Sequence, residues 1–589
     1  MSQNNKKFFD IHCHAFNLSH AGLLAFLNRF FLNNALSFKD LLNGRFFRIL
    51  IKLLYCRKAR IGCWLGRIAI LGAGIFLLLI LGLLINPAIL GIDILKLNSF
   101  QMLLVRGLMV FILFFVIFLA ILTIYWIMKK GISTKIHNAI NLLSLMENDL
   151  GRQFLYLELD VLKTDQDQTT NQLVNKIIDN HDDQRIINQV RQEWEETGKN
   201  FKIDNTDYTK VVLTPLMMDF NYKDFDGLEG ISYNLAPRKP IIDQVVDLYN
   251  GMKDYMKRSA FRILEIYPFL GINPKNYELG IVEEVELSSA PLGALDKKVC
   301  YLANYKTLSI VKKLNEEEIE TLLSLAAAEK DKETIHKMVH DFDKFGFDKR
   351  NSLAKMLHKY FGEYEPRYEN FESTFKSNFS VADKGIDKEK IQKISNYFFS
   401  GIKVYPPLGF DPWPEDDSEF RSVNYLFQFC SEKGIPITTH CSDSGFMVIE
   451  RKSSWDFTSP ARWSDVLREH KNLKLNFAHF GSQSYKKTDE WCKMIIELII
   501  EYDNVYADFS YRGVSERFYK ILDDVINSSP KDKIEKLKNR VLFGSDFLIN
   551  LIETESYGDY LVKFITASEF TPDEKLRFCT NNPERYLFV

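Results

Sequence analysis

The sequence lacks any excess of charge of one sign. Its 75 Lys and Arg residues almost balance its 77 Asp and Glu residues, which leaves a formal net charge of -2 over 589 residues. Nucleic-acid phosphates are bound by strongly basic surfaces, and this composition supplies no overall field of that kind. We therefore predict that nucleic acid is not a partner of this protein.

Paired cysteines and a secretory signal are also lacking. The eight cysteines include no Cys-x-x-Cys pair and are scattered along the chain, as is usual for reduced intracellular proteins. The N-terminal stretch MSQNNKKFFDIHCH has two lysines but no apolar core and no small-residue cleavage site. We expect neither a disulfide framework nor a secretory signal peptide.

Two long apolar runs stand out against this ordinary composition. Residues 68–92 and 107–128 contain no charged side chain. At about 1.5 Å per helical residue, each run is long enough to cross a hydrocarbon core of about 30 Å. The alternative is a pair of buried core helices, which rarely stay free of charge over such lengths. We predict a transmembrane hairpin over residues 68–128.

The segment before the hairpin, residues 15–67, is basic and apolar. Asp40 is its single acidic residue, whereas lysines and arginines recur among the apolar residues. Stretches such as FFRILIKLL (46–54) are typical of amphipathic helices on an anionic membrane surface, although ordinary surface helices remain an alternative. Basic residues flank both outer ends of the hairpin, which predicts a multi-pass membrane protein with its remaining domain in the cytoplasm.

Outside these segments, short β-rich runs alternate with helical patterns. This alternation predicts an α/β protein with a parallel sheet, specifically a (β/α)8 TIM barrel. The first strand lies in residues 1–14, and the remainder of the barrel in 129–589. Residues 161–208 are expected to form a solvated helical connection. A helical insertion at 275–395 is interpreted as a cap or a homo-oligomer contact. The expected strands are 8–14, 154–159, 211–216, 263–270, 401–405, 435–440, 473–480, 504–509 and 540–543.

Histidines and a carboxylate mark the ends of several expected strands. In FFDIHCH the two-residue period of a strand places His12 and His14 on one face. His440 ends GIPITTH, His479 ends LKLNFAH, and Asp546 follows RVLFGS. Active sites of parallel barrels form where the strands end, so these side chains are expected to meet. Nitrogen and oxygen ligands of this kind suit one divalent metal ion, zinc or manganese.

The ordered motifs resemble those of the metal-dependent amidohydrolase superfamily, in its amidohydrolase-related branch of hydrolases and decarboxylases. The resemblance covers the first strand and most of residues 211–589 outside the insertion. Ordinary relatives have a short loop where this chain carries residues 15–130. The matching motifs are DIHCH (10–14), VVLTPLMMDF (211–220), YPFLGINP (267–274), GIKVYPPLGF (401–410), THC at His440, AHFG at His479, FGSDF at Asp546 and NNPERYLF (581–588).

The resemblance implies a role for each matching ligand. His12, His14 and His440 would bind the metal, while Asp546 would complete the site and accept a proton from water. His479 would polarise the substrate or shuttle a proton. A bound divalent ion lowers the pKa of water from about 15.7 toward about 7, which suits hydrolysis at neutral pH.

Three further residues are assigned to substrate binding. Lys403 is one, although a carboxylated lysine at this position bridges a second metal in binuclear relatives. Arg512 could hold a substrate carboxylate or phosphate with its planar fork, and Tyr405 could line the pocket. We expect a membrane-anchored hydrolase of an amide, ester or related bond, acting on a small-molecule or lipid-linked substrate. The alternatives are a decarboxylase on the same site and a non-catalytic membrane scaffold.

Overall fold

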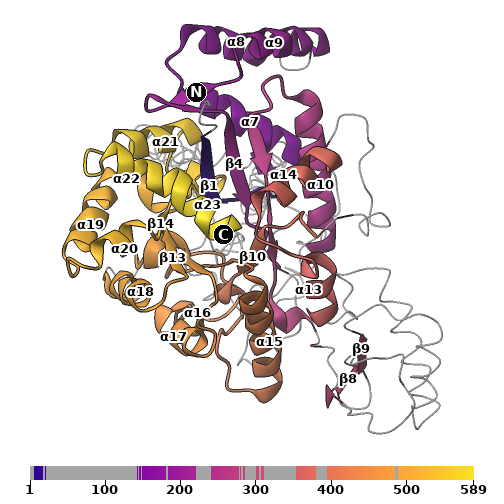
Figure 1. Cartoon of the computed structure of the whole chain (residues 1–589), viewed down its shortest axis with the longest axis vertical. Helices are drawn as coiled ribbons and strands as arrows, with labels where there is room; N and C mark the ends of the chain where they lie inside the picture. Colours follow the sequence, from indigo (N-terminus) through magenta and orange to yellow (C-terminus); the bar gives the residue numbers. More distant parts are fainter. Residues whose placement is uncertain are drawn as a thin grey trace, which may run out of the picture. The chain divides into compact units, whose positions relative to one another are not determined.

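The computed structural model describes part of the chain, and each feature below concerns those residues (Figure 1). They are residues 6–17, 20, 142, 145–146, 149–180, 183–220, 241–277, 279, 283–284, 300–303, 307–310, 353–379, 394, 396–484 and 488–589. The predicted hairpin (68–92 and 107–128), most of the basic segment and much of the 275–395 insertion lie outside these ranges. Within them, no helix is long and apolar enough to cross a membrane.

The chain divides into two compact units. The first comprises Met1–Arg48, Asn148–Asn550 and Ser556–Val589, and the second comprises Ile49–Glu147 and Leu551–Glu555. The barrel and all residues of the site described below belong to the first unit.

Parallel strands form two runs of the sheet, in the order β1-β4-β5 and β6-β10-β11-β12-β13-β14. Each neighbouring pair is parallel, as the alternating pattern of strands and helices predicts. The strands are β1 (Lys7–Cys13), β4 (Lys210–Pro215), β5 (Leu264–Ile266), β6 (Phe269–Gly271), β10 (Gly401–Val404), β11 (Ile437–Thr439), β12 (Leu475–Phe477), β13 (Val505–Asp508) and β14 (Val541–Leu542).

The expected strand 263–270 is divided into β5 and β6. Pro268 lies between them and has no N–H to donate to a neighbouring strand. Backbone hydrogen bonds still join both pieces to β4 and the residues that follow it, which form the second strand position of the barrel. Tyr267 N donates to Leu213 O at 2.9 Å, and Met217 N donates to Phe269 O at 3.1 Å. The two pieces therefore act as one barrel strand that changes its partner at the proline.

The barrel closes between its first and last strands. Ile11 N donates to Phe543 O at 3.2 Å, and Asp546 N donates to His12 O at 2.7 Å. With β5 and β6 counted as one position, closure completes eight parallel positions. The predicted (β/α)8 barrel is confirmed.

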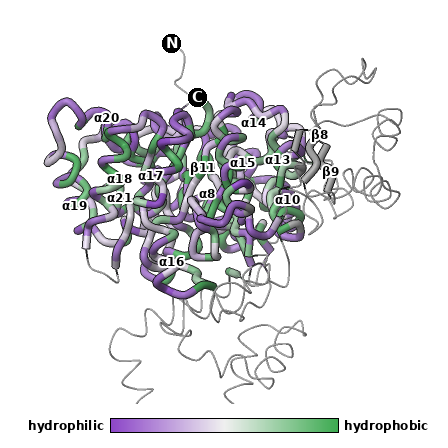
Figure 2. Tube along the Cα trace, turned by 90° about the horizontal axis from the view of Figure 1, so that it is seen from below, coloured by the Kyte–Doolittle hydropathy of each residue, from purple (hydrophilic) through white to green (hydrophobic). Residues whose placement is uncertain are grey.

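Helices follow the strands and cover the outside of the barrel (Figure 1). Their apolar faces pack on the strands, as Trp463 of α17 does on Phe477 of β12 with ring centroids 6.2 Å apart. In Figure 2 the hydrophobic tube lies mainly inside, around strands such as β11. The helices of the barrel are α10 (Ile241–Arg258), α13 (Leu353–Phe361), α14 (Tyr368–Asn378), α15 (Asp417–Lys433), α16 (Arg451–Thr458), α17 (Pro460–Glu469), α18 (Glu490–Glu501), α19 (Glu516–Asn527), α20 (Ile534–Lys538), α21 (Tyr557–Thr566), α22 (Pro572–Leu576) and α23 (Asn582–Phe588).

The described part of the insertion is not purely helical. Helices α13 and α14 agree with the expectation for residues 275–395. Three short antiparallel strands were not expected there: β7 (Glu283–Glu284), β8 (Cys300–Ala303) and β9 (Thr307–Ile310).

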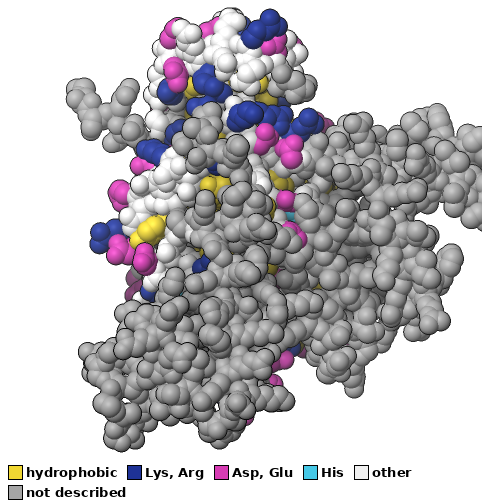
Figure 3. Space-filling model, turned by 90° about the vertical axis from the view of Figure 1, so that its right-hand side faces the viewer, with side chains coloured by type: hydrophobic (Ala, Val, Ile, Leu, Met, Phe, Trp, Pro, Cys, Tyr) yellow, Lys and Arg dark blue, Asp and Glu magenta, His cyan; other side chains and the backbone are white. Residues whose placement is uncertain are grey.

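On the face in Figure 3, the described acidic and basic side chains lie interspersed, in keeping with the balanced composition.

The prediction of a strand at residues 154–159 is wrong. These residues belong to helix α7 (Leu150–Leu162), whose buried residues include Phe154, Leu157 and Val161. This spacing of three and four residues follows one helix face, and the Asp149 side chain caps the first turn by accepting from Arg152 N. Beyond α7, the helices α8 (Gln168–Asp179) and α9 (Gln184–Glu196) precede a hairpin of β2 (Phe201–Ile203) and β3 (Thr206–Tyr208).

A buried carboxylate fastens α7 to the barrel. Glu158 is 1% exposed. Its oxygens accept hydrogen bonds from Tyr255 Oη at 2.6 Å, Ser259 Oγ at 2.6 Å and Ile263 N at 3.0 Å. Burial raises the pKa of Glu158 despite these donors. The three donors come from α10 and from the chain that enters β5, so one side chain joins three segments.

We expect Glu158→Ala to lower the stability of the barrel. The substitution leaves three buried donors without an acceptor, at a cost of about 1–3 kcal/mol for each unsatisfied group. The melting temperature, measured by differential scanning fluorimetry, should fall by at least about 5 °C. The control variant is Glu195→Ala at an exposed position of α9, which removes a surface ion pair with Lys199. It should change the melting temperature by about 1 °C or less. Equal shifts for the two variants would contradict the role of Glu158.

Candidate metal centre

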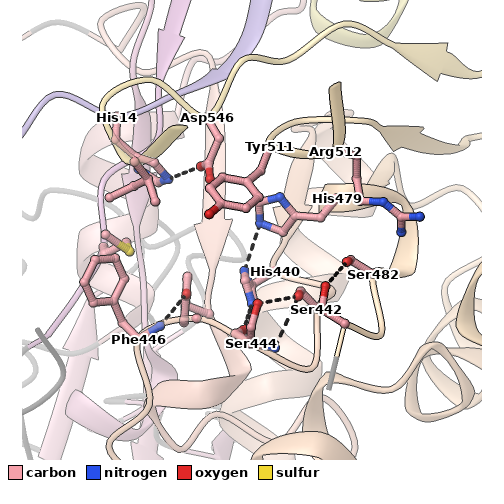
Figure 4. A pocket seen from close by; sticks show the side chains of 15 residues that line it. His14, His440, Ser442, Ser444, Phe446, His479, Ser482, Tyr511, Arg512 and Asp546 are labelled. Carbon is pink, nitrogen blue, oxygen red and sulfur yellow. Dashed lines mark hydrogen bonds and ion pairs between the residues drawn. The ribbon is translucent and has the colours of Figure 1, made fainter. Parts of the chain in front are cut away.

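Five polar side chains from the ends of four strands meet at the mouth of the barrel, and Figure 4 shows His14, His440, His479 and Asp546 of this set. His14 Nε2 lies 3.1 Å and His12 Nε2 lies 3.4 Å from Asp546 Oδ1. His479 Nε2 lies 3.2 Å from His440 Nδ1. All five residues are buried. The structure thus brings together the whole set of ligands proposed from the sequence, although β1 and Asp546 lie more than 500 residues apart.

The two histidines of β1 are each held by one ring nitrogen. His12 Nδ1 lies 3.0 Å from Asp508 Oδ2, and His14 Nδ1 lies 2.9 Å from the carbonyl oxygen of Leu216. Carbonyl and carboxylate oxygens only accept, so the network assigns the proton to Nδ1 in both rings. The Nε2 lone pair of each neutral ring is then directed toward Asp546.

The other two histidines are held in the same manner. His440 Nε2 donates to Ser444 O at 2.7 Å, and His479 Nδ1 donates to Ser510 O at 3.0 Å. The free nitrogens are therefore His440 Nδ1 and His479 Nε2, the two atoms that face each other. Two lone pairs at this distance repel in the absence of a shared cation, so the pair favours a metal between the rings.

A metal ion fits this donor set. The ligand atoms of His12, His479 and Asp546 lie within 4.8 Å of one another. Within the described part of the chain, His12 Nε2 is buried and has no hydrogen-bond partner. A buried polar atom without a partner is costly, and a metal would relieve that cost. Imidazole nitrogens with one carboxylate oxygen suit zinc or manganese.

Burial keeps three of the four histidines in the neutral form that binds a metal, whereas Asp508 raises the pKa of His12 although burial alone would lower it. Burial lowers the pKa of His479 to about 3, and burial beside His479 lowers the pKa of His440 well below its usual value. Burial also lowers the pKa of His14. For Asp546 burial acts in the opposite direction, but His12 and His14 hold the pKa of this carboxyl well below its usual value. Neutral imidazoles beside an ionised carboxylate are the states that coordinate metal ions.

The sequence analysis missed Asp508, the last residue of β13. Its carboxylate accepts from His12 Nδ1, from Asn476 Nδ2 at 2.6 Å and from Ser510 Oγ at 2.5 Å. Although burial would raise it, the pKa of Asp508 is lowered, chiefly by its interaction with His12. Its position at the end of VYAD matches that of the histidines at other strands and was the available signal.

Positive φ angles occur where three of the barrel strands end. His479, Tyr511 and Asp546 have positive φ angles of 60°, 62° and 60°. Residues with a Cβ rarely adopt this left-handed conformation, which costs about 1–3 kcal/mol at each position. The strain occurs after β12, β13 and β14, where the chain turns to direct side chains into the pocket.

The three proposed substrate-binding residues have different environments. Tyr405 and Arg512 line the pocket. Tyr405 stacks on His440 with ring centroids 4.4 Å apart, and its hydroxyl accepts from Phe446 N at 3.0 Å. Lys403 is not among the pocket-lining residues. Its Nζ is buried without a hydrogen-bond partner in the described part of the chain, and burial lowers its pKa to about 8.

The pocket has a polar and an apolar side. Arg512, Tyr511 and a group of serines line one side, while Met218 and Phe446 contribute apolar surface. Figure 4 shows Phe446 and Arg512 on opposite sides of the histidines. The complete set of lining residues is His14, Met218, Tyr405, His440, Ser442, Ser444, Gly445, Phe446, His479, Ser482, Ser484, Tyr511, Arg512, Asp546 and Ile549.

Comparisons with known proteins agree with the motifs of the sequence. The family model described as amidohydrolase matches residues 373–589. That range contains β10 to β14 and therefore His440, His479, Asp508 and Asp546. Among curated proteins, the comparison finds no significant match.

Solved structures show weaker likenesses. An uncharacterised TIM-barrel protein from Bordetella bronchiseptica is 17% identical over 34% of this chain and 62% of its own, with a TM-score of 0.24. A zinc-bound amidohydrolase from Burkholderia multivorans is 17% identical over 33% and 66%, with a TM-score of 0.22. The 5-carboxyvanillate decarboxylase of Novosphingobium aromaticivorans, solved with manganese, is 10% identical over 73% and 86%, with a TM-score of 0.27. This chain spans less than two thirds of the length of the first of these proteins.

We expect the purified protein to bind about one divalent metal ion per chain, measured by elemental mass spectrometry. Asp508→Asn removes the carboxylate that orients His12 and should weaken metal affinity about 10–100-fold in competition with a chelating indicator. Asp524→Asn, an exposed change on α19, should leave affinity unchanged. Equal affinities of the two variants would contradict the role of Asp508. Two metals per chain would point to a carboxylated Lys403 as a bridge.

Proposed function

We propose that this protein is a metal-dependent enzyme of the amidohydrolase family and that it hydrolyses an amide, ester or related bond with water as the nucleophile. The match of residues 373–589 to the amidohydrolase family model supports this proposal. One observation carries this proposal. Each of the four histidines donates from one ring nitrogen to a fixed acceptor, which leaves its second nitrogen directed into the pocket that contains Asp546. Such an arrangement serves a catalytic metal better than a purely structural contact.

The residues of the site divide the work between orientation and proton transfer. A divalent metal held by the histidines and Asp546 would polarise the substrate carbonyl and lower the pKa of water. Asp546 collects a proton from the attacking water as the new C–O bond forms, and returns it to the nitrogen or oxygen of the leaving group as the old bond breaks. Asp508 acts through His12 and is a positioning residue.

His479 remains open to two roles. Its grouping with His12 and Asp546 supports a place among the ligands, whereas its position on the pocket wall supports contact with the substrate. Both roles require its neutral form, which burial favours by lowering its pKa to about 3.

We expect Asp546→Asn to lower kcat about 10²–10⁴-fold, because the amide cannot collect the proton from water. His12→Ala should abolish turnover by removing a ligand. A screen of amides and esters at constant pH measures hydrolysis, and metal content is measured for each variant. Asp524→Asn is the exposed control for the carboxylate substitution. Full metal occupancy in both site variants would refute the ligand assignment.

The same screen separates the alternatives to hydrolysis. Carbon dioxide release would identify a decarboxylase, since the same ligands can hold a carboxylate substrate for C–C cleavage. Metal binding without turnover of any compound in the screen would favour a non-catalytic scaffold. Whether the enzyme forms a homo-oligomer stays a prediction.

We also propose that the enzyme is anchored in a membrane by residues 68–92 and 107–128. The proposal rests on the sequence, since both runs lie outside the described residues. The fold adds one constraint. Strand β1 pairs directly with β4, so a chain that leaves the barrel's side of a membrane after β1 must return to it before β4. Two crossings satisfy this requirement, and the basic flanks favour a cytoplasmic barrel.

The expected topology is testable with right-side-out membrane vesicles. An external protease should leave the barrel intact and should digest it after detergent is added. Detection uses an antibody against the C-terminal residues 582–588. Digestion of the barrel without detergent would refute the orientation, and release of the protein by alkaline carbonate would refute the anchor.

A further inference from the structure

Arg512 presents a cation to the pocket, and the carboxylates of Asp489 and Asp443 act on it only as neighbouring charges, without an ion pair. It follows β13, and its guanidinium carbon lies 4.5 Å from the ring centroid of Phe518. Its side chain is half-buried and makes no hydrogen bond or ion pair with any residue in the described ranges. Arginine is seldom removed from water without an acceptor for its N–H groups. Stacking fixes the plane of the guanidinium but satisfies none of these donors.

Two pairs of serine hydroxyls lie in the same pocket. Ser442 Oγ lies 2.9 Å from Ser444 Oγ, and Ser482 Oγ lies 3.2 Å from Ser484 Oγ. Within a pair, one hydroxyl donates to the other, so each pair retains one O–H for a further acceptor. The donors available to a ligand are thus two hydroxyls and the arginine fork.

The backbone joins the two serine pairs. A parallel bridge connects Ser442 with Ser482, and Asp443 N donates to Ser482 O at 2.9 Å. The loops after β11 and β12 are therefore fixed against each other where their hydroxyls reach the pocket. Figure 4 shows Ser442, Ser482 and Arg512 on the same side of the histidines, away from Phe446.

We propose that Arg512 and the two serine pairs form a subsite for a phosphate group of the substrate. The proposal deepens the proposed function, since it places that phosphate beside the bond hydrolysed at the metal centre. The donor count favours phosphate over carboxylate. The arginine fork alone satisfies the two oxygens of a carboxylate. A phosphate monoester has a third terminal oxygen, which the remaining hydroxyls can bind.

The test measures the binding of inorganic phosphate to the metal-free full-length protein by isothermal titration calorimetry. Removing the metal with a chelator prevents phosphate from binding to it instead. Arg512→Gln should weaken phosphate binding about 10–100-fold, as expected for loss of charged hydrogen bonds. Ser482→Ala removes one hydroxyl and should weaken binding about 3–10-fold. Arg517→Gln, an exposed change of the same charge on α19, should leave binding unchanged.

Several outcomes would overturn the subsite. They are the absence of phosphate binding, equal binding by Arg512→Gln and the wild type, and binding of acetate as tight as that of phosphate. Should Arg512→Gln melt below the wild type, Ser482→Ala decides, because the hydroxyl it removes contacts only the Ser484 side chain within the described residues. Since no metal is present, failure of this test leaves the hydrolase proposal intact. A lack of hydrolysis likewise leaves the phosphate result intact.

Discussion

The metal centre depends on the hydrogen bonds that close the barrel between β1 and β14. Asp546 N donates to His12 O at 2.7 Å, so the same contact that ends the sheet fixes the carboxylate beside His12. His12 and His14 come from the start of the chain and Asp546 from its end. No local structure in either segment could bring them within about 3 Å of each other. The ligand set is therefore a property of the closed barrel rather than of any one motif.

Closure buries polar groups, and the surrounding hydrogen bonds compensate for that cost. The carboxylate of Asp508 accepts five hydrogen bonds, and four histidines each donate from one nitrogen. His12 Nε2 remains unsatisfied, and three residues at the strand ends keep a left-handed backbone. An unsatisfied ring nitrogen and left-handed residues occur together at the candidate metal centre, which marks it as a part of the fold shaped by chemistry rather than stability.

The sequence predicted the barrel and the grouping of the five polar side chains because both follow from short-range periodicity. Buried strands of β10 to β14 appear as apolar runs, and a polar residue directly after each run must lie at the catalytic edge. The same signal failed at residues 154–159, where the buried Phe154 and Leu157 suit a helix as well as a strand. It also predicted a single strand over residues 263–270, which Pro268 divides into β5 and β6. Asp508 was missed although its position at the end of VYAD in β13 follows the same rule.

The substrate side of the pocket lies beyond such reasoning for a physical reason. Ligands of the metal occupy strand ends, whose positions the sheet dictates. The serine pairs and Arg512 come from three loops whose approach depends on the Ser442–Ser482 bridge and on stacking against Phe518. The residues that these contacts join follow no periodic pattern in the sequence. In the proposed function, strand geometry thus determines where a bond is broken, whereas loop contacts determine which molecule is held there. The family resemblance concerns the metal ligands at the strand ends. Which substrate is bound depends on the loops as they are assembled in the fold.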